Sequence, residues 1–279
     1  MQQSRMTRAE TSAIIAPAQR VEFNRDGFLI LRGALKEAAA FHALINELEN
    51  YARTFATDFS LSNPASVLAL AADDRTTLYC GLRYLPSLYR FVSDDLILSI
   101  SRALGIAFPG IELFNNIRMD LPGEDQYLFQ WHQDITYNLG SANCLTYWIP
   151  LSKTGAHYGG IEVIPGSHKR GIWPCEVVNP QGKSGLLTTR DIVITEQPQT
   201  PPVTLETEFG DLVVFSQMLL HKSLSNRSDN VRWTVQIRHS DFMEPYFRHA
   251  AFPMGDLTTL DKTSYLEEWT KDHGQDHPK

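Results

Sequence analysis

From residue 111 onward the chain is divided into short stretches of strand-forming residues, and this division limits the folds open to it. Glycine and proline separate the stretches, as tight turns between strands require. The stretches are 111–119, 127–132, 143–151, 161–164, 203–207, 211–216 and 231–240. Many short strands with turn residues between them are typical of a β-sandwich or jelly roll. Hydrophobic residues make up 43% of the chain, enough to bury a core.

The residues before 111 predict helices that flank this β region. The predicted elements are a strand at 28–31, an amphipathic helix over 36–56, and a second helix that begins at Ser93-Asp94-Asp95 and runs to Leu104. Gly105 suits the C-terminal end of that second helix. The fold class expected is therefore mainly β with flanking helices.

We expect the 279 residues to form a single domain. Its parts are a loose arm at 1–20, a helical flank at 21–110, a jelly-roll core at 111–240 and a C-terminal extension at 241–279, with one short helix around Tyr265 to Trp269. The stretch 176–202 is long and rich in Pro, Gly, Thr and Gln, which predicts a lid or active-site loop.

Charge, hydropathy and cysteine content exclude several classes of protein. The net charge is −7 and no basic stripe occurs, so we expect no nucleic-acid partner. The chain has no run of about eighteen apolar residues and no secretory signal, so we expect no membrane association. Three cysteines without a CxxC pair favour free thiols and a cytoplasmic protein. The expected partner is a small molecule, bound by a monomer or homodimer.

His132-Gln133-Asp134, followed later by His221, forms the motif with the clearest chemical meaning. If 127–134 is extended, His132 and Asp134 point to the same side and Gln133 to the other, because side chains two residues apart share a strand face. Two imidazoles and one carboxylate can hold a single Fe(II) and leave its opposite face open for an oxo-acid and O2. We therefore predict a metal centre at His132, Asp134 and His221.

Arg232 follows His221 across a turn at 226–230, and a hairpin there would return it to the depth of His221. A guanidinium at that depth can bind the far carboxylate of an oxo-acid. The last strand alternates, with Val231, Trp233, Val235 and Ile237 on one face and Arg232, Thr234, Gln236 and Arg238 on the other. The polar face is either wet and external or turned into a barrel mouth, and the neighbouring motif favours the second interpretation.

Other histidines compete for the role of metal ligand. His239-Ser240-Asp241 repeats the His-x-Asp pattern, but no later strand follows that could complete a site, so we interpret it as a polar strand end. His157 and His168 lie in sequences typical of loops, and we expect neither to bind metal.

Several further residues are candidates for binding the co-substrate or the substrate. Asn116 and Arg118 alternate with apolar residues, and an exposed strand edge is the competing interpretation for both. Thr146 could donate to the oxo-acid. Gln133 and Tyr137 are candidate substrate contacts, unless they serve ordinary packing. Arg118 and Arg238 would suit an acidic substrate.

At family level the sequence resembles the phytanoyl-CoA dioxygenases. The matching segments, in order, are Arg25-Asp26-Gly27-Phe28, Trp131-His132-Gln133-Asp134, the run from Gly159-Gly160 to His168-Lys169, Gly210-Asp211-Leu212, and His221-Lys222-Ser223 with Asn226, Ser228 and Arg232. The resemblance extends over residues 22–240, most of the chain.

The resemblance implies a double-stranded β-helix, the jelly roll of cupins, with Fe(II) at His132, Asp134 and His221. It implies 2-oxoglutarate as co-substrate, with Arg232 and Ser223 at its far carboxylate and Asn116 near it. Related halogenases have a small residue where this chain has Asp134, so hydroxylation is favoured over halogenation.

The expected function is hydroxylation of an aliphatic C–H bond in a small metabolite or natural-product intermediate, with release of succinate and CO2. The chain ends without a peroxisomal signal, so a coenzyme-A thioester is not the preferred substrate. Desaturation, epimerisation or ring formation with the same cofactors remains open. So do two functions of a different class, a non-redox jelly-roll protein that binds a small molecule and a cupin-type isomerase. Neither of these two needs the carboxylate clamp predicted at Arg232.

Overall fold

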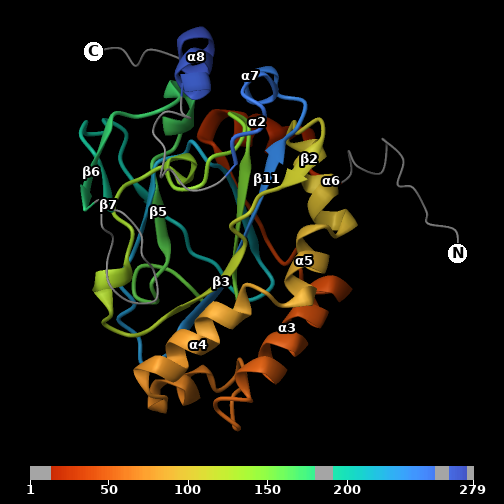
Figure 1. Cartoon of the computed structure of the whole chain (residues 1–279), viewed down its shortest axis with the longest axis vertical. Coiled ribbons are helices and arrows are strands. Elements are labelled where there is room, and N and C mark those ends of the chain that lie inside the picture. Colours follow the sequence, from red (N-terminus) through yellow and green to blue (C-terminus); the bar gives the residue numbers. More distant parts are fainter. Residues whose placement is uncertain (1–13, 180–190, 255–263, 275–279) are drawn as a thin grey trace, which may run out of the picture.

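A large antiparallel sheet forms the centre of the molecule (Figure 1). The computed structural model describes residues 14–179, 191–254 and 264–274. The strands run in the order β1 (Phe28–Leu31), β9 (Leu212–Ser216), β4 (Leu145–Pro150), β11 (Arg232–Asp241) and β2 (Pro109–Ile111). A further strand, β3 (Asn116–Asp120), pairs with the first half of β11, and β2 pairs with its end.

A smaller antiparallel sheet packs against one face of the large one. It has the order β10 (His221–Ser223), β5 (Ile161–Val163) and β8 (Val203–Thr204), and β6 (Cys175–Asn179) and β7 (Asp191–Ile194) form a separate pair. Trp148, Val213 and Phe215 from the large sheet pack with Ile161 and Val163 from the small one. The two sheets therefore enclose a common interior, and the predicted mainly β fold with flanking helices is confirmed.

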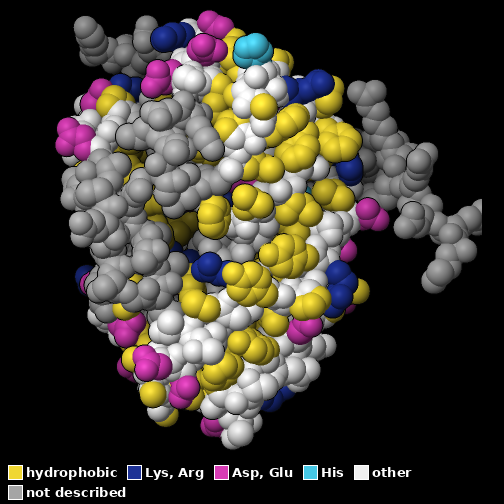
Figure 2. Space-filling view, in the orientation of Figure 1, with side chains coloured by type: hydrophobic (Ala, Val, Ile, Leu, Met, Phe, Trp, Pro, Cys, Tyr) yellow, Lys and Arg dark blue, Asp and Glu magenta, His cyan; other side chains and the backbone are white. Residues whose placement is uncertain are grey.

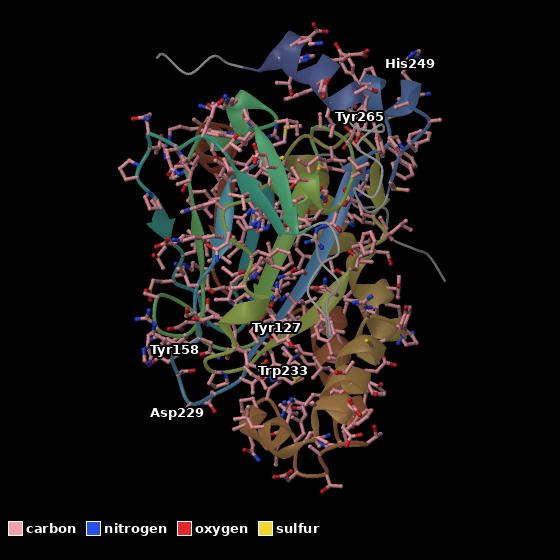
Figure 3. The ribbon with its side chains drawn as sticks, turned by 60° about the vertical axis from the view of Figure 1, so that its left-hand side comes forward. Tyr127, Tyr158, Asp229, Trp233, His249 and Tyr265 are labelled. Atoms are coloured by element: carbon pink, nitrogen blue, oxygen red, sulfur yellow. The ribbon has the colours of Figure 1, made fainter. Side chains whose placement is uncertain are left out.

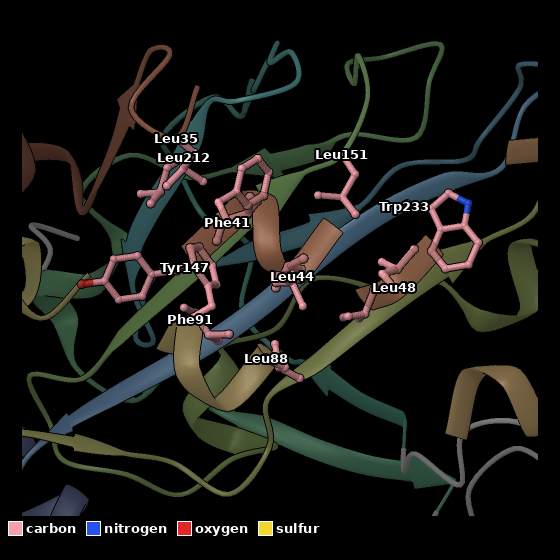
Figure 4. Packing of buried hydrophobic residues seen from close by; sticks show 14 of the residues in the cluster. Leu35, Phe41, Leu44, Leu48, Leu88, Phe91, Tyr147, Leu151, Leu212 and Trp233 are labelled. Carbon is pink, nitrogen blue, oxygen red and sulfur yellow. The ribbon is translucent and has the colours of Figure 1, made fainter. Parts of the chain in front are cut away.

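Helices cover the other face of the large sheet. They are α2 (Pro17–Asp26), α3 (Ala39–Ala52), the 3-10 helix η1 (Pro64–Ala69), α4 (Ala72–Leu82), α5 (Pro86–Val92) and α6 (Asp95–Ala103). Leu48 on α3 lies near Trp233 on β11, and Leu44 belongs to the same main core cluster (Figure 4). The stripe of apolar residues on α3 is buried, as its spacing predicts. The Asp94 carboxylate caps α6 by accepting from Leu96 N.

The C-terminal extension adds α7 (Pro245–His249) and α8 (Ser264–His273), which lie together at one end of the molecule (Figures 1 and 3). The remaining short elements are the 3-10 helices η2 (Asp125–Tyr127), η3 (Asp134–Thr136) and η4 (Ser167–Arg170). The hydroxyl of Tyr265 on α8 donates to Gly140 O in the β-rich part of the molecule. Within the described residues, none of the helices has the length and apolarity needed to cross a bilayer.

Two of the predicted strands are wrong in extent. The stretch 111–119 is split into β2 and β3, because the buried polar residues Glu112 and Asn115 bond to β11 instead of continuing the strand. The stretch 127–132 is not a strand. Its backbone forms η2 at the start and pairs only at His132, after which η3 turns the chain away.

Two other expectations also need correction. The arm expected at 1–20 is helical from Pro17, where a proline in the first helical turn favours helix initiation, and Ile15 is buried. Residues 1–13 lie outside the described residues. The stretch 176–202 contains most of β6 and all of β7, which pair with each other, and 180–190 lie outside the described residues.

Candidate metal centre

The backbone brings His132 and His221 face to face. His132 N donates to His221 O and His221 N donates to His132 O, both at 3.0 Å, so the two residues form an isolated antiparallel bridge. The bridge continues β10, and the imidazole ring centres lie 4.2 Å apart. Residues 89 positions apart in the chain are therefore neighbours because of main-chain pairing alone.

Hydrogen bonds fix which nitrogen of each imidazole is free. His132 Nδ1 lies 2.7 Å from Gln130 O, and His221 Nδ1 lies 3.0 Å from Leu219 O. A carbonyl oxygen can only accept, so each Nδ1 carries the proton and each Nε2 keeps a lone pair. Metal-binding histidines are commonly oriented in this way.

Asp134 completes a compact group with these two imidazoles. Its Oδ1 lies 3.5 Å from His132 Nε2 and 3.5 Å from His221 Nε2. One candidate ligand atom from each residue falls within 4.8 Å of the others. Among the residues that the structure describes, this is the one cluster of three or more His, Cys, Asp or Glu side chains with that geometry.

The opposite oxygen of Asp134 is held by the large sheet. Arg238 on β11 donates to Oδ2 from Nε at 3.1 Å and from Nη2 at 2.9 Å, and Thr146 Oγ1 on β4 donates at 2.7 Å. Arg238 and Thr146 were expected to bind substrate and oxo-acid. Their hydrogen bonds among the described residues go instead to the Asp134 carboxylate, because the two strands place both side chains inside the molecule.

Burial and charge set the protonation states of the group. Burial and the neighbouring His221 lower the pKa of His132 to about 4, although Asp134 opposes this effect. The imidazole is therefore neutral near pH 7, as a metal ligand must be. Burial alone would raise the pKa of Asp134, but the adjacent Arg238 guanidinium favours the charged form, and that pKa lies well below its usual value.

Arg232 lies on the same inward face of β11 as Arg238, and both are buried. Its Nη2 is 2.6 Å from Asp120 Oδ2, its direct partner on β3, and its Nη1 donates to Gly159 O. Its Nε has no hydrogen-bond partner among the described residues. The polar face of β11 is therefore internal, as the second interpretation of its alternation predicted.

The turn against which Arg232 rests depends on glycine. Gly159 has φ 69°, and a Cβ at Gly160 would lie 2.9 Å from Gly155 N. This turn also pairs with the one after β10, through Tyr158 and Asn226. The glycines thus allow the close backbone approach that supplies the carbonyl at Arg232.

Arg118 and Asn116 occupy the neighbouring strand β3. Arg118 is buried, donates from Nη2 to Asp120 Oδ1 at 2.6 Å, and lies 5.1 Å from the centre of the Phe129 ring. Its contacts among the described residues are with buried or half-buried neighbours, and its role as a substrate contact stays a prediction. Asn116 is half-buried and its Oδ1 has no hydrogen-bond partner among the described residues.

The remaining predicted residues fall in three different places. Gln133 is fully buried, and its amide bonds to the backbone of Gly171, Met218 and Trp173, so it faces away from the metal group and holds the surrounding chain. The Tyr137 ring lies 5.2 Å from that of His132, edge to face. Ser223 is half-buried on β10 and lines a cavity of about 360 Å³ whose lining contains none of the three candidate ligands.

The rival histidines lie elsewhere. His157 is exposed and contacts Tyr158. His168 packs against Gly27, and burial lowers its pKa to about 4. His239 is buried in the core, where its nitrogens lie 2.7 Å from Ser101 Oγ and 2.9 Å from Val92 O. Among the described residues, none of these three belongs to a metal-binding cluster.

Two buried acids near the site were missed by the sequence reasoning. Glu112 is bonded to Gln217 and Ser240, and burial raises its pKa to about 7. Asp120 bridges Arg118 and Arg232. The one available signal was that an acid interrupts the apolar run around Glu112. The pairing of Asp120 depends on strand register, which the local sequence does not reveal.

Comparison with known proteins gives a consistent result. The family model described as phytanoyl-CoA dioxygenase matches residues 23–234. The chain is 35% identical over 134 residues to 1-deoxypentalenic acid 11-beta-hydroxylase of Streptomyces exfoliatus, a match that covers 46% of this chain and less than half, 45%, of that protein.

Solved structures share the fold at low identity. EctD from S. alaskensis, solved with 2-oxoglutarate and 5-hydroxyectoine, aligns with a TM-score of 0.53 at 19% identity, over 87% of this chain and 80% of EctD. The alpha-ketoglutarate-dependent carbocyclase SnoK from nogalamycin biosynthesis aligns with a TM-score of 0.55 at 18% identity, over 81% and 84%.

A group of two histidines and one carboxylate is the arrangement typical of non-haem iron oxygenases. Within that class, the chain belongs to the phytanoyl-CoA dioxygenase family, whose model covers most of its length. It is therefore a dioxygenase that depends on iron and 2-oxoglutarate, and the resemblance found in the sequence is confirmed.

Proposed function

We propose that the protein hydroxylates an aliphatic C–H bond of a small metabolite or natural-product intermediate. In this reaction 2-oxoglutarate, O2 and the substrate yield succinate, CO2 and the hydroxylated product. The observation that carries the proposal is the convergence of two imidazole Nε2 atoms on one carboxylate oxygen, at 3.5 Å each. The match with a bacterial hydroxylase supports hydroxylation over the other outcomes of this chemistry.

The donor set fits a ferrous ion. His132 and His221 offer neutral nitrogens, and Asp134 offers an oxygen with one negative charge, the combination typical of non-haem iron oxygenases. A bound ferrous ion supplies the activation of O2, which no side chain can provide. The three residues would hold the ion, and the backbone bridge between the two histidines keeps the imidazoles in place.

Arg232 fits the far carboxylate of 2-oxoglutarate. Its Nε and the Thr234 hydroxyl are buried, belong to the same inward face of β11, and have no hydrogen-bond partner among the described residues. A dianion would satisfy these donors, whereas leaving them unpaired is unfavourable. Ser223, which follows His221 by two residues, and Asn116 are further candidates for this contact.

Aromatic rings shield one side of the group. Phe129 and Tyr137 each have ring centres 5.2 Å from that of His132, and they contact each other edge to face at 5.1 Å. Such a wall excludes water from the metal ligands and leaves an apolar surface suited to an aliphatic substrate. Tyr137 is therefore a candidate substrate contact.

A metabolite-library screen tests the proposal. Purified protein with Fe(II) and 2-oxoglutarate under air should form succinate faster when its substrate is added, and mass spectrometry should find one oxygen atom added to that substrate. His132→Ala should give neither signal. Substrate binding without succinate release would favour a binding protein, and loss of two hydrogens from the substrate would favour desaturation or ring formation.

A further inference from the structure

One oxygen of Asp134 is saturated with donors while the other is free. Oδ2 accepts from Thr146 Oγ1 and twice from Arg238, at 2.7–3.1 Å. Oδ1 has no such donor among the described residues of the sheet and faces the two Nε2 atoms. A carboxylate oxygen has only about two lone pairs, so Oδ2 has no capacity left for a cation. The adjacent guanidinium charge also repels a cation from that side.

The sheet register places both donors. Arg238 on β11 is the direct cross-strand partner of Thr146 on β4, so their side chains leave the sheet side by side on its inner face. Asp134 itself belongs to neither strand, since it begins η3. Two side chains of the large sheet, Arg238 and Thr146, thus hold by hydrogen bonds a carboxylate that comes from a connecting segment.

Arg238 is itself held from the other side by the link between β2 and β3. Its Nη1 donates to Phe114 O at 2.7 Å, and its backbone N donates to Asn115 Oδ1 at 2.9 Å. Leu113 and Phe114 of this link are exposed. The link itself crosses the face drawn in Figures 1 and 2, where Figure 2 shows many hydrophobic side chains. Nε, Nη1 and Nη2 of Arg238 are therefore all engaged, which fixes the direction of its guanidinium.

We propose that Arg238 and Thr146 are positioning residues that restrict Asp134 to a single metal-facing oxygen, Oδ1. This inference rests on the proposed function, because it assumes that the His-Asp-His group holds the metal. A six-coordinate metal with one atom from each of three ligands keeps three positions open, which 2-oxoglutarate and O2 together require. A carboxylate that bound through both oxygens would occupy one of them.

Manganese(II) provides a test that does not depend on turnover. Water-proton relaxation of the Mn(II)-loaded protein counts the water molecules on the metal. Arg238→Met should lower the relaxation per bound Mn(II) by roughly one third, because the released carboxylate takes one open position. Titration with 2-oxoglutarate should show about tenfold weaker binding, a loss typical of removing a partner that orients a metal ligand.

Thr146 offers a milder pair of variants that keep the Arg238–Asp134 ion pair. Thr146→Val removes one donor without changing side-chain size, so both effects should appear in the same direction but smaller. Thr146→Ser keeps the hydroxyl and should restore wild-type relaxation and affinity. This rescue separates the hydroxyl's role from packing, and it remains informative if Arg238→Met does not fold.

Arg232→Met serves as the matched control, since it removes a second buried arginine from the same strand face. It should weaken 2-oxoglutarate binding and leave the number of metal-bound waters unchanged. Unchanged relaxation and affinity in both Arg238→Met and Thr146→Val would overturn the positioning roles alone. A wild-type protein that fails to bind Mn(II) or Fe(II) would instead remove the proposed function and these roles with it.

Discussion

The chain contains two His-x-Asp segments, and the structure gives them opposite uses. His132 and Asp134 direct a free nitrogen and a free oxygen toward one point, together with His221. His239 and Asp241 lie at the end of β11, fully buried among protein partners. In both segments the middle residue, Gln133 or Ser240, is completely buried and bonds to its surroundings.

The two histidines have opposite tautomers. His132 donates from Nδ1 to a carbonyl, which leaves Nε2 free. His239 Nε2 faces the carbonyl of Val92 and must donate to it, so its Nδ1 accepts from the Ser101 hydroxyl. Both ring nitrogens of His239 are thus engaged by the protein. A His-x-Asp pattern can bind a metal only where the fold leaves its lone pairs without protein partners.

The largest expected effect is on the first segment. In His132→Ala, metal affinity and substrate-stimulated succinate formation should each fall more than roughly a hundredfold. The loss should be this large because removing a hydrogen-bond partner of a metal ligand already costs up to about a hundredfold, and this variant removes the ligand itself. Metal removal by a chelator should lower the melting temperature of the wild type but not that of this variant, because only the wild type gains stability from bound metal. Metal content after dialysis and thermal melts measure both effects.

The matching change in the second segment should affect stability instead. His239→Ala leaves a cavity and removes the donor to the buried Val92 carbonyl, so the free energy of unfolding should fall by about 3 kcal/mol. Metal stoichiometry per folded protein should stay at the wild-type value. Denaturant titration and metal analysis check this pair of results, and a loss of metal from folded protein would contradict the distinction between the segments.

Glu112 gives a pH-dependent comparison, since it accepts from Ser240 of the second segment. Burial raises its pKa from 4.5 to about 7. Below pH 4.5 Glu112 is protonated in the folded and the unfolded protein, so its contribution to the free energy of unfolding is fully present. This contribution is lost as the pH rises to about 7, because the unfolded protein ionises first and the folded protein would have to bury a charged carboxylate. The free energy of unfolding should fall by about 3 kcal/mol over this range, because each tenfold change in an ionisation constant corresponds to about 1.4 kcal/mol.

Glu112→Gln isolates that contribution, because the amide has a similar shape and does not ionise. Relative to wild type, the variant should gain stability as the pH rises from 4.5 to 7.5, by up to about 3 kcal/mol. Urea titrations of both proteins at several pH values give the difference. A difference that stays constant with pH would show that Glu112 ionises normally.

The smallest effect is expected at Asp241. Its carboxylate accepts from the backbone N of Ala107 and Phe108 at 2.9 and 3.0 Å, and from Asn143. Asp241→Asn keeps one acceptor oxygen and loses the charge, so unfolding should become easier by about 1 kcal/mol. Metal affinity should not change. An isothermal titration with Mn(II) beside a denaturant titration distinguishes this from the behaviour of Asp134.

Local pattern was enough to predict part of this molecule. The alternation of β11 and the spacing of apolar residues on α3 are short-range signals, and both elements formed where expected. The His-x-Asp motif with a later histidine likewise identified a group that the fold does bring together.

Contacts between distant strands could not be predicted in this way. The sequence around Thr146 and Arg238 does not show that the two are cross-strand partners, or that both donate to Asp134. The same holds for the pairing of His132 with His221. The sequence predicts a strand over 127–132, and the structure has only this single bridge there. Register depends on the whole sheet, so one residue's role in it is not a local property.

Arg238 and Thr146 make the position of the Asp134 carboxylate depend on the register between β4 and β11. Side chains alternate along a strand, so a slip of one residue between β4 and β11 would turn one of the two donors away from Asp134. A chain with a misaligned sheet would therefore lack a properly held carboxylate. If Arg238 and Thr146 have the proposed roles, the geometry of the metal-facing oxygen depends on correct pairing of these two strands.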